Sequence, residues 1–382
     1  MLEAVARHRP DHLAFANAAY GSPSLLRAGE SNIMSAKGIQ QGDPLGPLLF
    51  CLALDEPLKG VRSEFVSGYL DDVGMGDTVQ NLIDQVRCIE AAASSIGLQL
   101  NHAKCEIIGL SSSQRSLWES SGLQFLPRSV EDASLLGAPL SLKGTDKALG
   151  ESFDQLERVR GRLLKLSSHE AFFLLKNSLG IPRLQHLLRT APCSLSSEVQ
   201  RLDEEIRGIL SSMLNLKLED DAWTQASLPV RWGGVGVRKA SSLAPSAFLA
   251  SASAASPLIK RLLPESCHLL PDRVFHETVT RWSKLSGADF PSGQDAICQR
   301  ALDDGISSAI SKELLLRADP ANRARLLASL APGSGSWLQA LPCKNLGLLL
   351  GENELRIGVG LRLGAPLVRA HQCVCGSEVE SN

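Results

Sequence analysis

The stretch Phe65-Val66-Ser67-Gly68-Tyr69-Leu70-Asp71-Asp72-Val73-Gly74-Met75-Gly76 decides how the first part of the chain folds. Two short strand-like runs flank the tripeptide Leu70-Asp71-Asp72, which ends in two carboxylates. This pattern predicts a hairpin with the carboxylates at its tip. Adjacent carboxylates repel each other, and a divalent metal ion would offset that repulsion. Taken alone, however, an Asp-Asp pair is more often a solvated turn.

Helices are expected on both sides of this hairpin. Upstream, Gly42-Asp43-Pro44 opens a helical run over residues 45–59, because a proline near the first helical turn loses no hydrogen bond there. Downstream, Thr78 is expected to cap a helix that Gly97 ends.

The neighbouring segments complete a small α+β domain. Residues 1–36 read as a helix and a loop, with a turn at Gly21-Ser22-Pro23-Ser24. Residues 98–100 and 105–108 look like another strand pair. The order of these elements predicts a domain of short antiparallel sheet and helices that ends near residue 145.

The pattern becomes helical from about residue 150 to residue 215, where apolar residues recur at helical spacing. Within it, Ser197-Glu198-Val199-Gln200 fits a capping box. Stretches rich in proline, glycine and serine around residues 224–256 and 331–337 are expected to divide the remainder.

The charge is distributed unevenly. The chain has 39 basic and 41 acidic residues and a net charge of −2, which gives weak support for nucleic-acid binding. Residues 158–189, however, contain seven basic residues and one acidic residue. The near-zero total therefore hides a local basic patch.

Composition indicates a soluble intracellular protein. The 382 residues are 44% hydrophobic, which is enough for two or three domains with ordinary cores. No stretch approaches the ~20 apolar residues of a membrane span, and the first residues do not resemble a secretory signal. Nine scattered cysteines suggest reduced thiols. No membrane partner is expected, and nucleus or cytoplasm, like the oligomeric state, stays open.

Three further segments form an ordered series with the carboxylate pair. Gly38-Ile39-Gln40-Gln41-Gly42-Asp43-Pro44-Leu45-Gly46-Pro47-Leu48-Leu49-Phe50 lies upstream. Gly97-Leu98-Gln99-Leu100-Asn101-His102-Ala103-Lys104-Cys105-Glu106 and then Leu135-Leu136-Gly137-Ala138-Pro139-Leu140 follow. In this order and spacing, the series closely resembles the palm motifs of non-LTR retrotransposon reverse transcriptases.

The resemblance implies an RNA-directed DNA polymerase that uses two-metal nucleotidyl transfer. Asp71 and Asp72 match the carboxylates that hold Mg²⁺ or Mn²⁺. Lys104 matches a lysine that approaches the phosphates of the nucleotide, where a cation would stabilise charge on the leaving group. The implied partners are an RNA template and a DNA primer.

Further positions match the parts that hold the substrates. Gln41 and Gly42 match the Gln-Gly step beside the incoming nucleotide, and Tyr69 is assigned to nucleotide or template binding. Leu136 and Gly137 match the turn that supports the primer terminus. Without the series, these residues would read as a helix start, a core residue and ordinary turns.

In such enzymes a helical thumb follows the palm and grips the duplex by its phosphates. Arg158, Arg160, Arg162 and Lys165 would suit that role, because phosphate neutralisation provides most of the sequence-independent affinity. A solvated helix face is an equal alternative. The resemblance therefore predicts a partial palm over residues 1–145, a thumb-like region over residues 150–215 and a mostly helical region over residues 216–382.

The sequence departs from the family pattern near its start. A working palm needs a further aspartate on an earlier strand, and the first ten residues do not accommodate that strand. Asp11 lies in Arg9-Pro10-Asp11-His12, which reads as a turn. With fingers also expected to be absent, we expect that this chain alone does not polymerise.

The C-terminal residues also depart from a complete pattern. His371, Cys373 and Cys375-Gly376 resemble the start of a Cys/His cluster, but tetrahedral zinc needs four ligands. Cys267-His268 would complete the set only if the fold brought them close. Stable zinc binding is therefore not expected.

Two other hypotheses compete with the polymerase. The first is a non-catalytic nucleic-acid-binding remnant that uses the basic helices of residues 158–189. The second is an unrelated α+β and helical interaction protein, against which the motif series argues.

Overall fold

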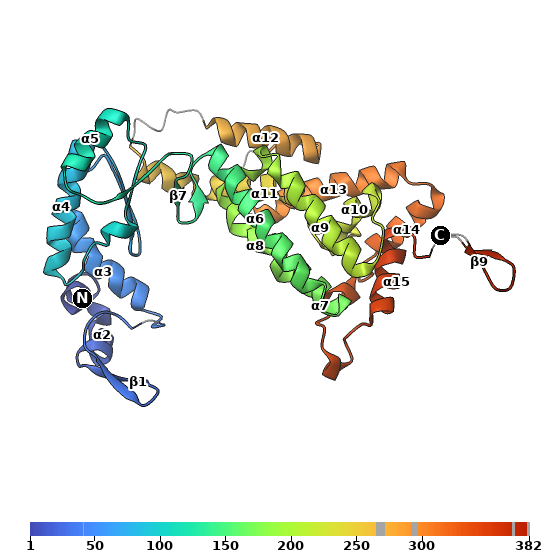
Figure 1. Cartoon of the computed structure of the whole chain (residues 1–382), viewed down its shortest axis with the longest axis horizontal. Coiled ribbons are helices and arrows are strands. Elements are labelled where there is room, and N and C mark those ends of the chain that lie inside the picture. The colour runs from blue at the N-terminus through green and yellow to red at the C-terminus, as the bar shows by residue number, and fades with distance from the viewer. Residues whose placement is uncertain (41, 265–271, 292–296, 369–370, 380–382) are drawn as a thin grey trace. The chain divides into compact units, whose positions relative to one another are not determined.

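The computed structural model describes residues 1–40, 42–264, 272–291, 297–368 and 371–379 (Figure 1). The chain divides into two compact units. The first comprises Met1–Ser129 and Leu258–Leu270, and the second comprises Val130–Pro257 and Pro271–Asn382.

The first unit combines short helices with paired strands. Its helices are α1 (Leu2–His8), α2 (Leu13–Tyr20), α3 (Gly46–Lys59), α4 (Val79–Ser95) and α5 (Ser112–Ser120), with 3-10 turns η1 (Pro10–His12) and η2 (His102–Lys104). The antiparallel pairs are β1 (Ser24–Ala28) with β2 (Ser31–Ser35) and β3 (Phe65–Tyr69) with β4 (Asp72–Gly76). In addition, β5 (Glu106–Ile108) pairs in parallel with β6 (Leu126–Arg128).

The local predictions around the carboxylates are confirmed. Helix α3 begins one residue after the predicted start, and the β3–β4 hairpin forms where expected. The side chain of Thr78 caps α4 by accepting a hydrogen bond from the amide of Asn81. Gly97 follows the helix with φ +81°, a left-handed conformation that favours glycine.

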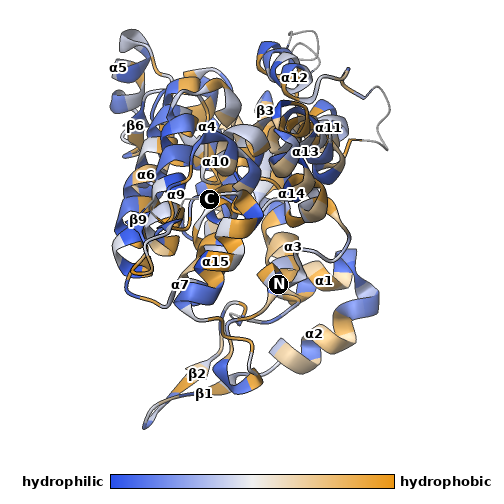
Figure 2. Ribbon diagram, turned by 90° about the vertical axis from the view of Figure 1, so that its right-hand side faces the viewer, coloured by the Kyte–Doolittle hydropathy of each residue, from blue (hydrophilic) through white to orange (hydrophobic). Residues whose placement is uncertain are grey.

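Two predictions in the first unit are wrong. Residues 24–35 form the β1–β2 hairpin and not a loop, because four strand-forming side chains flank a turn at Gly29, which has φ +63°. These side chains are exposed and give the hairpin its hydrophobic segments in Figure 2; they are Leu25, Leu26, Ile33 and Met34. Residues 98–100 form no strand, and β5 pairs with β6.

A small core lies beneath the β3–β4 hairpin. Val79, Ile83 and Val86 form one face of α4 and pack with Ile107 and Trp118. Met75 of β4 packs against this cluster. The hydrophobic contacts therefore anchor β4 near its end and leave the turn with the carboxylates free.

The second unit is mainly helical. Its helices are α6 (Leu142–Leu163), α7 (Ser168–Leu174), α8 (Ile181–Thr190), α9 (Glu198–Leu214), α10 (Asp220–Ala226), α11 (Ala240–Leu262, of which residues 258–262 belong to the first unit), α12 (Arg273–Ser286), α13 (Gln299–Arg317), α14 (Pro320–Leu330) and α15 (Glu352–Leu363). A π-helical segment, η3 (Leu175–Leu179), joins α7 to α8. Short 3-10 turns are η4 (Cys193–Leu195), η5 (Val230–Trp232), η8 (Ser336–Gln339) and η9 (Lys344–Leu346). Two short antiparallel pairs are β7 (Ser134–Leu135) with β8 (Ala138–Pro139) and β9 (His371–Gln372) with β10 (Glu378–Val379).

Its main core joins helices that are distant in the sequence. Leu156 of α6, Leu188 of α8 and Ile206 of α9 are buried in one cluster, together with Ala244 of α11 and Val359 of α15. The predicted helical region of residues 150–215 is therefore packed into the same core as helices beyond residue 216.

The predicted capping box at α9 is wrong. Ser197 already has helical dihedral angles (φ −74°, ψ −22°), and its side chain makes no capping hydrogen bond. The hydroxyl of Ser196 instead accepts a hydrogen bond from the amide of Glu198 (3.2 Å) and donates one to Asp146. A contact with α6 thus moves the capping role by one residue.

The prediction that residues 224–256 divide the helical region holds only in part. Residues 227–239 connect α10 to α11, whereas residues 240–256 belong to α11, which continues through Pro245 and Pro257. Among the described residues, α11 alone is long and apolar enough to cross a membrane, with a mean hydropathy of 1.2 over 18 residues. Core helices pass the same test, and Ala240 and Leu249 are fully buried here. Length and composition are therefore weak evidence for a membrane span.

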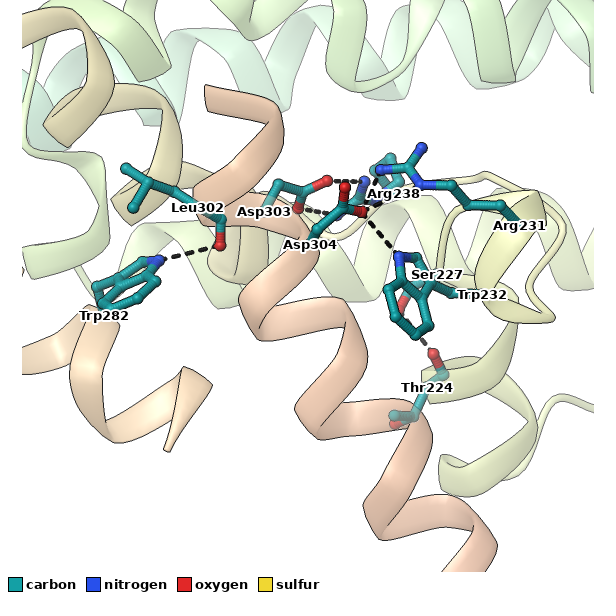
Figure 3. Close-up of polar contacts among 9 residues, drawn as sticks. All are labelled: Thr224, Ser227, Arg231, Trp232, Arg238, Trp282, Leu302, Asp303 and Asp304. Carbon is teal, nitrogen blue, oxygen red and sulfur yellow. Dashed lines mark hydrogen bonds and ion pairs between the residues drawn. The ribbon is translucent and has the colours of Figure 1, made fainter. Parts of the chain in front are cut away.

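Polar contacts fasten the segment around η5 to α13 (Figure 3). Arg238 donates two hydrogen bonds to Asp303, at 2.8 and 2.5 Å. Arg231 (3.0 Å) and the indole of Trp232 (2.8 Å) donate to Asp304. Of the two ion pairs, Arg238–Asp303 is the less accessible to solvent, with side chains that are 18% and 8% exposed, respectively.

Asp303→Asn is expected to lower the free energy of unfolding of the second unit by about 3 kcal/mol, because it leaves the Arg238 guanidinium unpaired in a buried site. The matched change Asp304→Asn should cost about 1 kcal/mol, since both side chains of the Arg231–Asp304 pair are more accessible. Urea unfolding followed by tryptophan fluorescence measures both values. Equal losses for the two variants would contradict this ranking.

Candidate nucleotidyl-transfer site

The β3–β4 hairpin presents both carboxylates at its tip, with Asp71 in a two-residue turn and Asp72 at the start of β4. Tyr69 pairs with Asp72 at the end of the ladder, and Leu70 and Asp71 form the connection. Leu70 has φ +55°, a left-handed conformation that is unusual for a leucine. Such backbone strain clusters at functional sites. Tyr69, Asp71 and Asp72 are all exposed.

Hydrogen bonds hold the base of this hairpin. The hydroxyl of Ser63 donates to the carbonyl of Gly76 (3.2 Å). The carboxylate of Asp77 accepts from the amides of Glu64 (2.8 Å) and Thr78 (2.6 Å), and these bonds lower the pKa of Asp77. The anchored base and exposed tip leave Asp71 and Asp72 available to a ligand from solvent.

The loop before α3 contains the Gln-Gly step. Gln41 lies outside the described residues. Gly42 has φ +95°, and a Cβ atom would meet nothing within 4 Å. The need for glycine here is therefore conformational and not steric.

Tyr20 and Asp43 fix this loop, and sequence analysis did not assign either of them a role. The Tyr20 hydroxyl donates a hydrogen bond to the carboxylate of Asp43, which also accepts from the amide of Leu45 (2.8 Å). Both bonds lower the pKa of Asp43, with that from Tyr20 the larger cause. Burial and then the bond to Asp43 raise the pKa of Tyr20. Their separation in sequence leaves no local pattern that would have linked them.

Lys104 lies at the end of η2, immediately before β5, and its side chain is exposed. Among the described residues, no ion pair or hydrogen bond joins the Lys104 ammonium to the hairpin. The structure therefore places Lys104 and the carboxylates in the same unit without a direct polar contact between them.

The turn assigned to the primer terminus belongs to the second unit. Leu136 (φ +50°) and Gly137 (φ +78°) connect β7 to β8, and two successive left-handed residues are typical of tight hairpins. The Nε2 atom of His186 lies 3.0 Å from the carbonyl oxygen of Leu136. Helix α8 therefore holds this turn, which the sequence did not indicate.

The predicted phosphate-binding residues fall into two groups. Arg158, Arg162 and Lys165 are exposed, and no ion pair in the described part of the chain involves them. Arg160 instead contacts Glu205 and Ser212 of α9, both at 3.4 Å. It is thus partly engaged in packing α6 against α9.

Lys176 is an exception within the local basic patch predicted for residues 158–189. Its ammonium donates hydrogen bonds to the carbonyl of Leu338 (2.9 Å) and to the side chain of Gln339 (3.2 Å). Burial lowers the pKa of Lys176 to about 8. This cation therefore faces another segment of the second unit and does not extend the exposed group.

A separate cluster has the composition of a metal site but is an ion-pair network. Among the described residues, His8, Asp55 and Glu56 form the one group of three possible ligands with atoms within 4.8 Å of one another. Arg7 (2.8 Å) and Lys59 (2.9 Å) already pair with Glu56. Hydrogen bonds from Lys59, His8 and Arg7 lower the pKa of Glu56 to about 2. These cations leave no net negative charge to attract a metal ion.

The C-terminal cysteines flank a tight turn between β9 and β10. Cys373 exchanges backbone hydrogen bonds with Ser377 and Gly376, both at 2.8 Å. Hydrogen bonds from the backbone and then the side chain of Ser377 lower the pKa of Cys375 to about 7. Cys267 and His268 lie outside the described residues, so the expectation of no stable zinc stays a prediction.

The part of the chain that contains this hairpin is similar to a known protein family. Residues 10–137 match the family model described as reverse transcriptase (RNA-dependent DNA polymerase). This stretch is a reverse transcriptase segment of the non-LTR retrotransposon type. The reverse transcriptase segment contains the Gln-Gly loop, the Asp71–Asp72 turn, Lys104 and the Leu136–Gly137 turn.

Curated relatives support the same assignment. The chain is 29% identical over 257 residues to the Retrovirus-related Pol polyprotein from type-2 retrotransposable element R2DM of Drosophila melanogaster, covering 59% of this chain and 23% of that protein. It is 27% identical over 234 residues to the Retrotransposable element SLACS 132 kDa protein of Trypanosoma brucei gambiense, covering 55% and 18%. The chain therefore spans about a fifth of the length of these relatives, and the matched region extends beyond the reverse transcriptase segment.

Tyr20→Phe is expected to raise the pKa of Asp43 toward its ordinary value, because the change removes the strongest hydrogen bond to the carboxylate. A lowered folded-state pKa stabilises the fold above the ordinary pKa of aspartate, and that contribution is lost as pH falls through the folded-state value. The free energy of unfolding of the variant should therefore fall less steeply than that of the wild type as the pH is lowered through this range. Carbon-13 NMR titration of the Asp43 carboxyl group measures the shift.

The chain offers a matched control, because Tyr69 is its other tyrosine and is exposed. Tyr69→Phe should leave the titration of Asp43 unchanged. Identical titration curves for Asp43 in the wild type and in Tyr20→Phe would show that the Tyr20 contact does not hold the loop.

Proposed function

We propose that this chain contributes the palm carboxylates and a thumb to an RNA-directed DNA polymerase. The observation that carries the proposal is the exposed Asp71–Asp72 pair at the tip of a hairpin whose turn residue Leu70 is strained, within the reverse transcriptase segment.

The donor chemistry of the turn suits Mg²⁺ or Mn²⁺. Both ions prefer oxygen ligands, and Mg²⁺ is commonly held by one or two carboxylates together with water and substrate phosphates. Asp71 and Asp72 supply two such carboxylates and are open to solvent. When bound, the metal would activate the primer hydroxyl and stabilise the leaving pyrophosphate.

The remaining residues would bind and orient the reactants. Gln41 and Gly42 would lie beside the incoming nucleotide, in a loop that Tyr20 and Asp43 fix, and Tyr69 would contact the nucleotide or template. Lys104 would offset negative charge on the phosphates. Leu136 and Gly137 would support the primer terminus, with the turn held by His186.

Paramagnetic Mn²⁺ is expected to broaden the NMR signals of residues around the Asp71–Asp72 turn. Asp71→Asn combined with Asp72→Asn should abolish this broadening, because it removes both anionic ligands and leaves amide oxygens that bind the ion weakly. Glu56→Gln serves as the control and should change nothing at the turn. Broadening that persists in the double variant would contradict the proposed metal site.

We expect no steady primer extension by the isolated chain with either metal. In the described residues, no third His, Cys, Asp or Glu ligand atom joins Asp71 and Asp72 within 4.8 Å. Two carboxylates leave the site with few anionic ligands for two metal ions. Steady extension that Asp71→Ala abolishes would overturn this expectation while supporting the assignment of Asp71.

The exposed cations favour a second candidate function, non-catalytic binding of nucleic acid. Arg158 and Arg162 are four residues apart on α6 and share one face, and Lys165 follows just beyond the helix. Acidic residues lie earlier on the same helix, at Glu151 and Asp154. Basic residues in the last turn, Arg160 and Arg162, also complement the helix dipole, which is the structural alternative to phosphate binding.

Replacing Arg158, Arg162 and Lys165 together by alanine is expected to weaken RNA binding and make it less sensitive to salt. Each lost phosphate contact should reduce the slope of log affinity against log salt by roughly 0.7–0.9. Fluorescence anisotropy over a salt series measures both effects. Arg160→Ala is the control and should leave the slope unchanged, since Arg160 contacts Glu205. Equal slopes for the triple variant and the wild type would exclude these residues from phosphate binding.

A further inference from the structure

A cavity of about 670 Å³ lies within the second unit, away from every residue discussed as a polymerase site. One wall comes from the η5 segment and another from residues 330–339, and Lys176 of η3 joins them. The volume falls in the range of pockets that bind small molecules. Pro229, Val230 and Leu330 give part of the lining an apolar surface.

The charged residues of the lining are all basic. Lys176, Arg231 and Arg238 line the cavity, and no carboxylate does. Asp303 and Asp304 pair with the two arginines but do not contribute to the lining. The cavity therefore presents cations to a ligand.

Of the three cations that line the cavity, Lys176 has the most unused capacity to bind an anion. Its ammonium contacts two neutral oxygens, at 2.9 and 3.2 Å, and pairs with no carboxylate in the described part of the chain. A third N–H remains for a ligand. Burial disfavours its charged form, as the lowered pKa reflects, and a bound anion would relieve that cost.

Close packing gives the cavity a fixed shape. A Cβ atom on Gly236 would lie 2.9 Å from Cε of Lys176, and one on Gly335 would lie 2.2 Å from Cγ1 of Val230. The Arg362 guanidinium donates hydrogen bonds to the carbonyls of Val230 (3.2 Å) and Ser334 (3.3 Å), one from each wall. Such preorganisation lowers the entropy cost of binding.

We propose that this cavity binds a nucleoside phosphate, with the phosphate at Lys176 and the nucleoside against the apolar wall. Serine hydroxyls of the segment after α14, at Ser334 and Ser336, also line the cavity and offer further polar contacts. The ligand is either a free nucleotide or the terminal nucleotide of a nucleic-acid strand, which share this chemistry.

Acetylation of lysines by acetic anhydride, read by mass spectrometry, tests the proposal on the full chain. Uridine 5′-monophosphate at millimolar concentration should slow the labelling of Lys176 several-fold, because bound phosphate covers the amine and raises its pKa. With this mononucleotide, Lys165 should be labelled at an unchanged rate. Protection by a short 5′-phosphorylated oligouridylate alone would identify a strand end as the ligand, and protection by both probes would identify the nucleotide.

Variants distinguish binding in this cavity from binding at the polymerase residues and from binding at the exposed cations Arg158, Arg162 and Lys165. Lys176→Gln keeps a donor for Leu338 and should weaken binding on the order of tenfold by losing the charge, whereas Lys176→Arg should retain it. Asp71→Asn should leave binding unchanged. The experiment with the oligouridylate uses the chain in which Arg158, Arg162 and Lys165 are replaced by alanine, so that these exposed cations do not bind the strand. If both probes leave the labelling of Lys176 unchanged, or if Lys176→Gln and the wild type bind with equal affinity, the proposal is overturned.

Discussion

The second unit depends on one buried guanidinium for which the described residues provide no carboxylate partner. Arg362 of α15 donates hydrogen bonds to the backbone carbonyls of Val230, Gly234, Ser329 and Ser334, between 3.0 and 3.3 Å. Val230 lies in η5 and Ser329 in the last turn of α14, while Gly234 and Ser334 lie in the loops that follow them. The carbonyls at the end of a helix and in a loop have few helical partners, so the guanidinium supplies donors that the backbone lacks there. Gln225 and Arg325 extend the network to the carbonyl of Arg362 itself. One side chain near the C-terminus therefore sets the shape of two loops distant in the sequence, and the cavity and the η5 contacts with α13 follow from it.

The first unit uses the opposite arrangement for its carboxylates. Hydrophobic packing of Met75 and hydrogen bonds to Asp77 hold the base of the β3–β4 hairpin, and the tip carries its charges without any neutralising partner in the described residues. In the ion-pair network around Glu56, by contrast, neighbouring cations neutralise the carboxylates. Exposure and the lack of a partner distinguish Asp71 and Asp72 from the other acidic clusters more clearly than composition does.

Local features of the fold could be read from the sequence, and long-range ones could not. The β3–β4 hairpin, α3 and the Thr78 cap depend on a few adjacent residues, so spacing alone predicts them. The parallel pairing of β5 with β6 joins segments separated by α5, and the wrong partner, residues 98–100, was nearer in the sequence. The cap of α9 moved from Ser197 to Ser196 because Asp146 of α6 contacts that hydroxyl. For the candidate site, motif order indicated the carboxylates and the Gln-Gly step, but Tyr20, Asp43 and His186 act through contacts that no local pattern encodes. Lys176 was counted with the basic patch because its contacts with Leu338 and Gln339 are also long-range and leave no local pattern.

The π-helical segment η3 has a consequence for how this region tolerates changes in length. In η3 the amide of Gly180 reaches back to the carbonyl of Leu175 (3.0 Å), so this turn holds one residue more than an α-helical turn. Removing one residue would restore ordinary helical winding and rotate everything that follows by about 100° relative to α7. The buried face of α8, with Ile181 and Leu188, would then point to solvent, and His186 would leave the Leu136 turn. A deletion in η3 would therefore disturb the second unit more than a substitution at one of its exposed residues, Asn177 or Ser178. The length of this segment is constrained even where the identity of its side chains is not.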